Sequence, residues 1–279
     1  MSDTSLYIVA TPIGNLGDIS NRAKEVLSFV DVVAAEDTRV TKKLFTLLGI
    51  SVQKKFITYE DHSEQARFQE IIDLINEGMK VALVSDAGSP LISDPGYKLV
   101  RECRKQGIKI TTIPGASAVI CALQLSGLPT NRFMFAGFIP NKDKARLDLF
   151  MELKNINTTL VLYETAIRLL KTLDVIEKVM PNREVAIVRE ITKLYEECIF
   201  GNISDVKEKI KENPIKGEIV LVISQPNEQN CEEINLEEII IKELENNTLK
   251  VAVKNITERY KLKRNEVYDK ALEIKNKQL

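Results

Sequence analysis

The chain has 279 residues, long enough for two compact domains, and its 39 Lys and Arg residues nearly balance its 40 Asp and Glu residues. The overall charge therefore does not indicate a nucleic-acid partner, which only a local basic patch could reveal. The four cysteines form no CxxC pair, so neither a zinc site nor a disulfide framework is indicated. The N-terminus lacks a basic leader, and no apolar stretch approaches the roughly 20 residues of a membrane helix. We therefore expect a cytoplasmic protein with reduced thiols and no membrane contact.

Strands and helices alternate through the first half of the chain. Short apolar runs predict strands at residues 6–10, 32–35, 55–59, 80–84 and 108–113. Apolar residues at helical spacing predict helices at residues 22–29, 67–76, 97–106 and 118–125, and another that ends near residue 48. This alternation is typical of a mostly parallel, doubly wound sheet. The sequence thus predicts an N-terminal α/β domain over residues 1–128.

The pattern restarts after residues 127–129. It predicts strands at residues 133–137, 159–163, 184–189, 196–203 and 218–224, the fourth of them antiparallel to a neighbour. Helices are expected at residues 147–153 and 206–211, with one more ending near residue 178. The sequence therefore predicts a second α/β domain over residues 129–226, with more strand and less helix than the first.

The C-terminal residues are basic, unlike the chain as a whole. Residues 225–233 are polar and predict a linker, whereas residues 248–277 carry nine Lys or Arg and four Asp or Glu, a local charge of +5. Two apolar stripes on either side of residues 261–263 predict two short helices and a tight turn. We expect a small helix-turn-helix-like extension over residues 236–279. A solvated helical hairpin packed on the body fits equally well, because one basic helix pair is a weak nucleic-acid signal.

Residues 84–96, with the sequence VSDAGSPLISDPG, follow a buried strand and precede a helix. Gly88 and Gly96 can adopt backbone conformations closed to other residues, and Pro90 and Pro95 fix φ. A rigid loop after a parallel strand is where α/β proteins bind ligands. An ordinary connection is the alternative, but similar loops at residues 11–18 and 114–117 favour a binding site.

Known catalytic and phosphate-binding loops are absent from the sequence. It contains no GxxxxGK[ST], no GxGxxG that opens a helix and no GxSxG. Because His62 is the single histidine, a histidine-rich metal cluster lacks ligands, and we expect no metal. The Gly- and Pro-rich loops suit a flat, neutral-to-zwitterionic ligand held by backbone groups, of which S-adenosylmethionine is one example.

Eight segments carry a more specific signal: LYIVATPIGNLGDIS, VVAAEDTRVTKKL, LVSDAGSPLISDPGYKLV, IPGASAVICALQLSGLP, GFIP, YETAIRL, REITKLYE and KGEIVLVI. In their order and over nearly the whole chain, they resemble the bacterial 16S ribosomal RNA cytidine 2′-O-methyltransferases of the tetrapyrrole methylase superfamily. The combination of AEDTR with SDAGSPLISDPG is highly specific, and the basic tail matches the family's small helix-turn-helix-like extension.

The resemblance implies two α/β domains with S-adenosylmethionine in the cleft between them, and a homodimer. It implies that loops at residues 12–18, 86–90 and 115–118 hold the cofactor together with second-domain backbone near Tyr163. The cofactor-binding residues expected on this basis are Pro12, Gly14, Asp86, Gly88, Pro90, Ser117, Ala118 and Tyr163. Three departures concern this site: YETAIR lacks the histidine that usually precedes its Arg, PGAS lacks a Pro after its Gly, and DHSE replaces DHNE or EHNE.

The implied reaction transfers a methyl group to the ribose 2′-hydroxyl of a cytidine in 16S rRNA of the small ribosomal subunit. The sulfonium methyl is already activated, so catalysis needs mainly positioning, to which a general base could add about 10²–10⁴-fold. His62 and Glu190 are candidates for the base, and Lys193 beside Glu190 is a further candidate catalytic residue. His62 has the better intrinsic pKa, whereas Arg189 and Lys193 beside Glu190 would keep its pKa low and suit a positioning role.

RNA would be held by its phosphates and by a splayed nucleotide. The candidate phosphate contacts are Arg39, Lys42, Lys43, Lys142, Lys144, Arg146 and Arg168. Solvated surface charge is the simpler interpretation of most of them taken singly. Two rival functions share parts of this pattern: methylation of a tetrapyrrole or of a modified histidine on a translation factor (a diphthine-type reaction), and non-catalytic nucleic-acid binding. The first group of rivals lacks AEDTR in this setting and lacks the basic tail.

Overall fold

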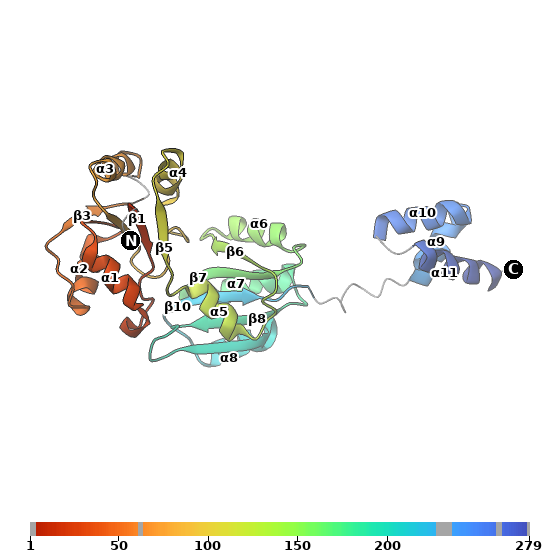
Figure 1. Cartoon of the computed structure of the whole chain (residues 1–279). Coiled ribbons are helices and arrows are strands. Elements are labelled where there is room, and N and C mark those ends of the chain that lie inside the picture. The colour runs from red at the N-terminus through yellow and green to blue at the C-terminus, as the bar shows by residue number, and fades with distance from the viewer. Residues whose placement is uncertain (1–3, 61–63, 227–235, 261–263, 278–279) are drawn as a thin grey trace. The chain divides into compact units, whose positions relative to one another are not determined.

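The computed structural model describes residues 4–60, 64–226, 236–260 and 264–277. The chain divides into two compact units, Met1–Gln225 and Pro226–Leu279, and each is described by itself (Figure 1). Within the described residues, none of the helices combines the length and apolarity that crossing a membrane requires.

The first sheet has five parallel strands in the order β3-β2-β4-β1-β5. The strands are β1 (Leu6–Val9), β2 (Val32–Ala35), β3 (Lys55–Thr58), β4 (Val81–Val84) and β5 (Ile110–Ile113). The intervening helices are α1 (Asn21–Phe29), α2 (Thr38–Leu47), α3 (Glu64–Asn76) and α4 (Tyr97–Lys105), with a short 3-10 turn, η1 (Leu16–Asp18), before α1. The interior strands β2 and β4 are buried throughout, as expected for a sheet that is covered on both faces.

Helices cover the two faces of this sheet. Residues of α1 and α2, such as Leu27 and Phe45, pack with Val33 and Val84 on one face. Residues of α3 and α4, such as Ile71 and Leu99, pack with alternate strand residues on the other face. Side chains cap the first two helices: the Ser20 hydroxyl accepts from Ala23 N at the start of α1, and the Asp37 carboxylate accepts from Arg39 N at the start of α2. The doubly wound parallel sheet is confirmed.

The second sheet is mixed, in the order β6-β7-β10-β8-β9, with β6 and β7 parallel and the other neighbours antiparallel. Its strands are β6 (Phe133–Phe138), β7 (Thr159–Thr165), β8 (Glu184–Arg189), β9 (Glu197–Asn202) and β10 (Glu218–Ile223). The helices α6 (Asp143–Leu153), α7 (Ala166–Val179) and α8 (Ile203–Glu212) cover one face. The predicted antiparallel partner of β9 is β8.

Helix α5 (Ala118–Ser126) packs on the other face of the second sheet, although it directly follows β5 of the first. Val119, Ala122 and Leu123 of this helix contact strand residues such as Val161 and Val220. The sequence assigned this helix to the first domain because it precedes the break at residues 127–129. Its apolar side chains instead complete the core of the second sheet, so the chain crosses between the two sheets immediately after β5.

The C-terminal unit is a three-helix bundle of α9 (Leu236–Asn246), α10 (Leu249–Tyr260) and α11 (Arg264–Lys277). Its core is formed by Ile240, Val253, Ile256, Val267, Ala271 and Ile274. The last two helices were predicted from the sequence, but α9 was not, because its many acidic residues made its apolar stripe hard to recognise. The predicted turn at residues 261–263 and most of the predicted linker lie outside the described residues.

Candidate active site

The three glycine- and proline-containing loops meet because they follow neighbouring strands. Strand β1 lies between β4 and β5, all three are parallel, and their carboxyl ends share one edge of the sheet. Thr11 and Gly88 form an antiparallel bridge with N···O distances of 2.8 and 3.1 Å. The Ser89 hydroxyl donates to Ala116 O at 3.2 Å and so joins the third loop. The predicted ligand-binding loops therefore form one continuous surface.

Asp86 connects the loop after β4 to the neighbouring strand β2. Its carboxylate accepts a hydrogen bond from Asp37 N at 3.0 Å and so links the ends of β4 and β2. Burial raises the pKa of Asp86 above its ordinary value, while the Arg39 guanidinium lowers the pKa of Asp37 to about 2. Within the described residues, these bonds connect the AEDTR and SDAG motifs physically, and Asp86 lines neither of the cavities described below.

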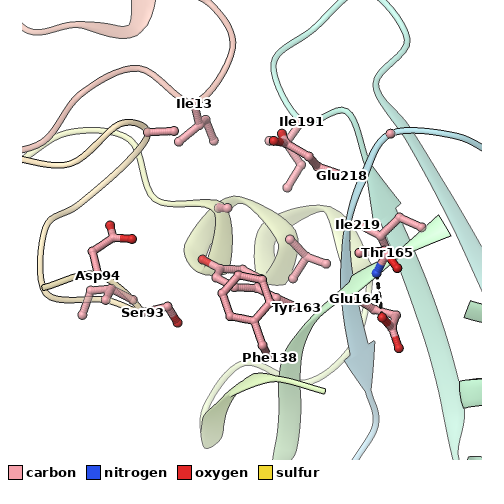
Figure 2. Close-up of a pocket in the computed structure, with 15 residues that line it drawn as sticks. Ile13, Ser93, Asp94, Phe138, Tyr163, Glu164, Thr165, Ile191, Glu218 and Ile219 are labelled. Carbon is pink, nitrogen blue, oxygen red and sulfur yellow. Dashed lines mark hydrogen bonds between the residues drawn. The ribbon is translucent and has the colours of Figure 1, made fainter. Parts of the chain in front are cut away.

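A cavity of about 310 Å³ opens between these loops and the second sheet (Figure 2). It is lined by Ile13, Ala87, Ile92, Ser93, Asp94, Ala118, Phe138, Tyr163, Glu164, Thr165, Ile191, Gly217, Glu218, Ile219 and Val220. A second cavity of about 480 Å³ shares Ile13 and Ile191 with the first and is also lined by Ser117. Volumes of this size are typical of sites for small molecules and cofactors.

One wall of the first cavity is aromatic. The Tyr163 ring lies edge-on to Phe135 and Phe138, with centroid distances of 4.9 and 5.0 Å. Figure 2 shows Tyr163 beside Phe138, with Ser93 and Asp94 on the loop across the cavity. Burial raises the pKa of Tyr163, and the Asp94 carboxylate adds to that shift, so its phenol stays protonated at neutral pH.

The lining of this cavity suits S-adenosylmethionine chemically. Flat apolar walls suit an adenine ring, and carboxylates suit the positively charged sulfonium and ammonium groups. Asp94 and Glu218 are lining carboxylates. The described residues contain no cluster of three or more His, Cys, Asp or Glu side chains that could hold a metal ion.

The predicted cofactor residues fall into two groups. Ala118 and Tyr163 line the first cavity, and Ser117 lines the second. Within the described residues, the other five lie behind the cavity surface in the loops that build it: Pro12, Gly14, Asp86, Gly88 and Pro90. Whether all eight hold the cofactor stays a prediction, but the structure separates those in position to touch it from those that support the loops.

Gly88 and Gly14 each allow a neighbouring side chain to approach the loop backbone closely. Gly88 has φ +89°, and a Cβ there would lie 3.3 Å from the Ile13 side chain. A Cβ on Gly14 would lie 2.6 Å from Lys193 Cγ, so the aliphatic part of Lys193 packs on the first loop. The sequence predicts Gly88 as a cofactor-binding residue with a permissive backbone, and the structure adds the neighbouring Ile13 as a side chain that a Cβ would meet.

Glu190 lies in an ion-paired network at the cavity's edge. Lys193 Nζ is 3.2 Å from Glu190 Oε1 and 2.8 Å from Glu218 Oε2. The hydrogen bond from Glu218 N is the largest cause that lowers the pKa of Glu190, and Lys193 lowers it further. The two carboxylates raise the pKa of Lys193. This geometry favours a positioning role for Glu190, and His62 lies outside the described residues.

All four non-glycine residues with positive φ in the described part of the chain lie in two loops at these cavities. They are Leu91 (72°), Ser93 (68°), Glu190 (49°) and Thr192 (64°). Such conformations cost energy, persist where surrounding contacts impose them and are concentrated at functional sites. The strained loops at residues 91–94 and 190–192 therefore support a site here independently of cavity size.

Two of the expected phosphate contacts are held inside the protein. Arg146 is only 2 % exposed, and its guanidinium donates to Asp143 Oδ1 and Asn141 O. Arg168 pairs with the buried Glu164 carboxylate at 2.6 Å. Helix α6 begins at Asp143, earlier than the expected helix at residues 147–153, and its first turn directs Arg146 inward. We therefore no longer assign Arg146 to RNA, and Arg168 has a structural partner. Arg39, Lys42 and Lys142 are exposed.

Several lining residues were missed by the sequence analysis: Asp94, Phe138, Glu164, Ile191, Gly217 and Glu218. Most of them belong to motifs quoted above, such as GFIP, REITKLYE and KGEIVLVI. The available signal was their position at the ends of the predicted strands. That signal does not tell which side chain turns toward a cavity.

Comparison with known proteins gives a consistent result. Residues 5–207 match the family model described as Tetrapyrrole (Corrin/Porphyrin) Methylases. The chain is 44% identical over 273 residues to a Pasteurella multocida protein named Ribosomal RNA small subunit methyltransferase I, covering 96% of each chain. Proteins of the same name from Erythrobacter litoralis and Rickettsia prowazekii are 48% and 46% identical, covering 97% and 85% of this chain and 95% and 84% of theirs.

Solved structures share the fold at lower sequence identity. Uroporphyrin-III-C-methyltransferase from Thermus thermophilus aligns with a TM-score of 0.53 and 20% identity, covering 78% of this chain and 93% of that one. A diphthine synthase aligns with a TM-score of 0.59 and 15% identity, covering 79% and 90%. These likenesses establish a common fold.

Proposed function

The chain belongs to the tetrapyrrole methylase family, and we propose that it methylates RNA of the small ribosomal subunit with S-adenosylmethionine as the methyl donor. The observation that carries this proposal is the 40–48% identity to proteins named Ribosomal RNA small subunit methyltransferase I. Several of these matches cover about 95% of both chains. The tetrapyrrole and diphthine enzymes share the fold at 14–20% identity, which supports neither alternative substrate.

We propose the ribose 2′-hydroxyl of a cytidine in 16S rRNA as the acceptor. When bound, S-adenosylmethionine supplies a methyl group that is already activated for in-line displacement. The protein would provide position: Tyr163 and Phe138 offer flat walls, and Asp94 and Glu218 offer negative charge. Enclosure between the two sheets would exclude water and hold the two reactants in line. An rRNA acceptor also implies a cytoplasmic site of action on the small subunit, and we propose a homodimer.

The direct test is methyl transfer from labelled S-adenosylmethionine to small ribosomal subunits that lack the modification. We expect label in the RNA, recovered as 2′-O-methylcytidine after digestion to nucleosides. Label on a base, in ribosomal protein, or in an added tetrapyrrole instead would contradict the proposal. The same reaction on protein-free 16S rRNA would show whether the assembled subunit is the substrate.

Removal of the C-terminal unit is expected to weaken RNA binding without changing cofactor binding. The cut belongs after Gln225, because a cut behind α9 would leave Ile240 without its core partners. The removed residues 226–279 contain ten Lys or Arg and eleven Asp or Glu, but the basic ones are concentrated in residues 248–277, which carry a local net charge of +5. If this basic segment contacts phosphates, the truncated protein should show a shallower dependence of affinity on salt. Each lost phosphate contact should reduce the log–log slope by about 0.7–0.9.

The measurement is subunit affinity at several salt concentrations, with calorimetry for S-adenosylmethionine. Equal salt slopes for the full and truncated chains would show that this unit does not bind RNA electrostatically. If the truncation disturbs folding, Lys250→Glu tests the same charge effect. Lys250 is exposed, so this change leaves the core of the helical unit intact.

A further inference from the structure

The turn between β8 and β9 has an unusual distribution of side chains. Leu194 is 88 % exposed and Tyr195 is 67 % exposed, whereas the charged residues around them are used in internal contacts. Lys193 pairs with Glu190 and Glu218, and Arg189 pairs with Glu197 at 2.7 Å. A solvated turn normally presents its polar residues and hides its apolar ones. This turn, residues 190–196, does the reverse.

The turn is also held rigidly. Lys193 N donates to Glu190 O at 2.9 Å, and Glu196 N donates to Lys193 O at 3.2 Å. Thr192 N donates to the Glu196 carboxylate at 2.6 Å, and the Thr192 hydroxyl donates to the Asp18 carboxylate on the first loop. Positive φ at Glu190 and Thr192 is maintained by these bonds. The apolar tip is therefore presented in a fixed position.

The apolar tip, Leu194 and Tyr195, lies at the edge of the candidate site. Ile191 lines both cavities, and Thr192 and Glu196 line the second. Tyr195 and Leu194 stand between these lining residues in sequence and point to solvent. A molecule that reaches the cavities from solvent would meet these two side chains at the rim.

We propose that Leu194 and Tyr195 form an RNA contact in which Tyr195 stacks on an unpaired base beside the target nucleotide. The inference rests on the proposed function, because an enzyme that methylates one cytidine has to recognise its RNA site, and sequence-specific RNA recognition targets unpaired bases that can be splayed out. Proteins stabilise unstacked bases with exposed aromatic rings. The cations beside the tip, Lys193 and Arg189, are held in ion pairs within the protein, so the contact is with a base rather than with phosphates. A stable protein interface buries about 800 Å² per partner, far more than this narrow tip offers.

A tryptophan reporter tests the stacking directly. The chain contains no Trp, so a Tyr195→Trp variant carries a single tryptophan whose fluorescence is quenched when it stacks on a base. Phe29→Trp is the matched control, because Phe29 is also exposed, at 51 %. It ends α1 just before β2 begins, so it lies at the amino ends of the parallel strands, whereas the candidate site lies at their carboxyl ends. We expect quenching by small-subunit RNA in the first variant only. Equal responses of both variants would overturn the proposal.

Activity gives a second readout. Base–aromatic stacking is worth about 1–3 kcal/mol, so Tyr195→Ala should raise the KM for small subunits by about 5- to 150-fold, and Tyr195→Phe should retain nearly normal KM. Cofactor affinity and the salt slope should not change. A KM equal to that of Phe29→Ala would refute the contact, and a loss of dimer in sedimentation would assign the tip to a second copy of the chain. If the wild-type protein does not methylate small subunits, the proposed function fails rather than this contact.

Discussion

A Gly88→Val variant is expected to bind S-adenosylmethionine at least about 100-fold more weakly than the wild type, a loss of about 2.8 kcal/mol. Gly88 has φ +89°, and its added Cβ would press on the Ile13 side chain at 3.3 Å. Ile13 lines both cavities, so its displacement narrows the site. The bridge between Thr11 and Gly88 would also be strained, which loosens two of the three loops. Calorimetric titration with the cofactor measures the effect.

Gly78→Val separates this local effect from backbone strain. Gly78 has φ +93°, and a Cβ there has nothing within 4 Å. Both variants should lose about 1–2 kcal/mol of unfolding free energy, because a side chain in left-handed backbone costs that amount. Only Gly88→Val should lose cofactor binding. Equal cofactor affinities in the two variants would mean that the three loops do not form the cofactor site.

The sequence analysis located the loops correctly because parallel topology leaves little freedom. Once β1, β4 and β5 are recognised as strands of one doubly wound sheet, their carboxyl ends must share an edge. The roles of individual residues in those loops depend on distances of a few tenths of an ångström. Asp86 illustrates this: the resemblance implies a cofactor-binding role for it, which stays a prediction, and only the structure shows that its carboxylate accepts from Asp37 N.

Contacts between distant segments could not be predicted from the sequence. Arg146 seemed exposed because it stands among Lys142 and Lys144, yet one turn of α6 directs its guanidinium inward to Asn141 O. Helix α5 follows the first sheet in the chain and packs on the second, which no local periodicity reveals. Glu190 acquires its low pKa chiefly from Glu218 N, a group 28 residues away, rather than from the adjacent cations alone.

Substitution of a general base is also expected to have a large effect on the rate of methyl transfer. Glu190 has a pKa below its ordinary value, so it stays ionised throughout pH 5.5–8 and cannot produce a change of rate there. Its ionised form stabilises the fold above its unfolded pKa of about 4.5, and this contribution is lost as the pH falls through the lower folded value. A Glu190→Gln variant should therefore change the rate of methyl transfer without moving the midpoint of the pH profile.

His62 is the stronger of the two candidates for the base, on grounds of chemistry. An imidazole has an ordinary pKa of about 6.5, which makes it an efficient proton acceptor near neutral pH. Single-turnover methylation by His62→Ala, with cofactor and subunits saturating, should be slower by about 10²-fold or more. The rise in rate between pH 5.5 and 8 should flatten in the same variant. A loss smaller than about threefold, with the pH profile unchanged, would leave positioning of the two reactants as the source of catalysis, because an activated methyl group needs alignment more than it needs a base.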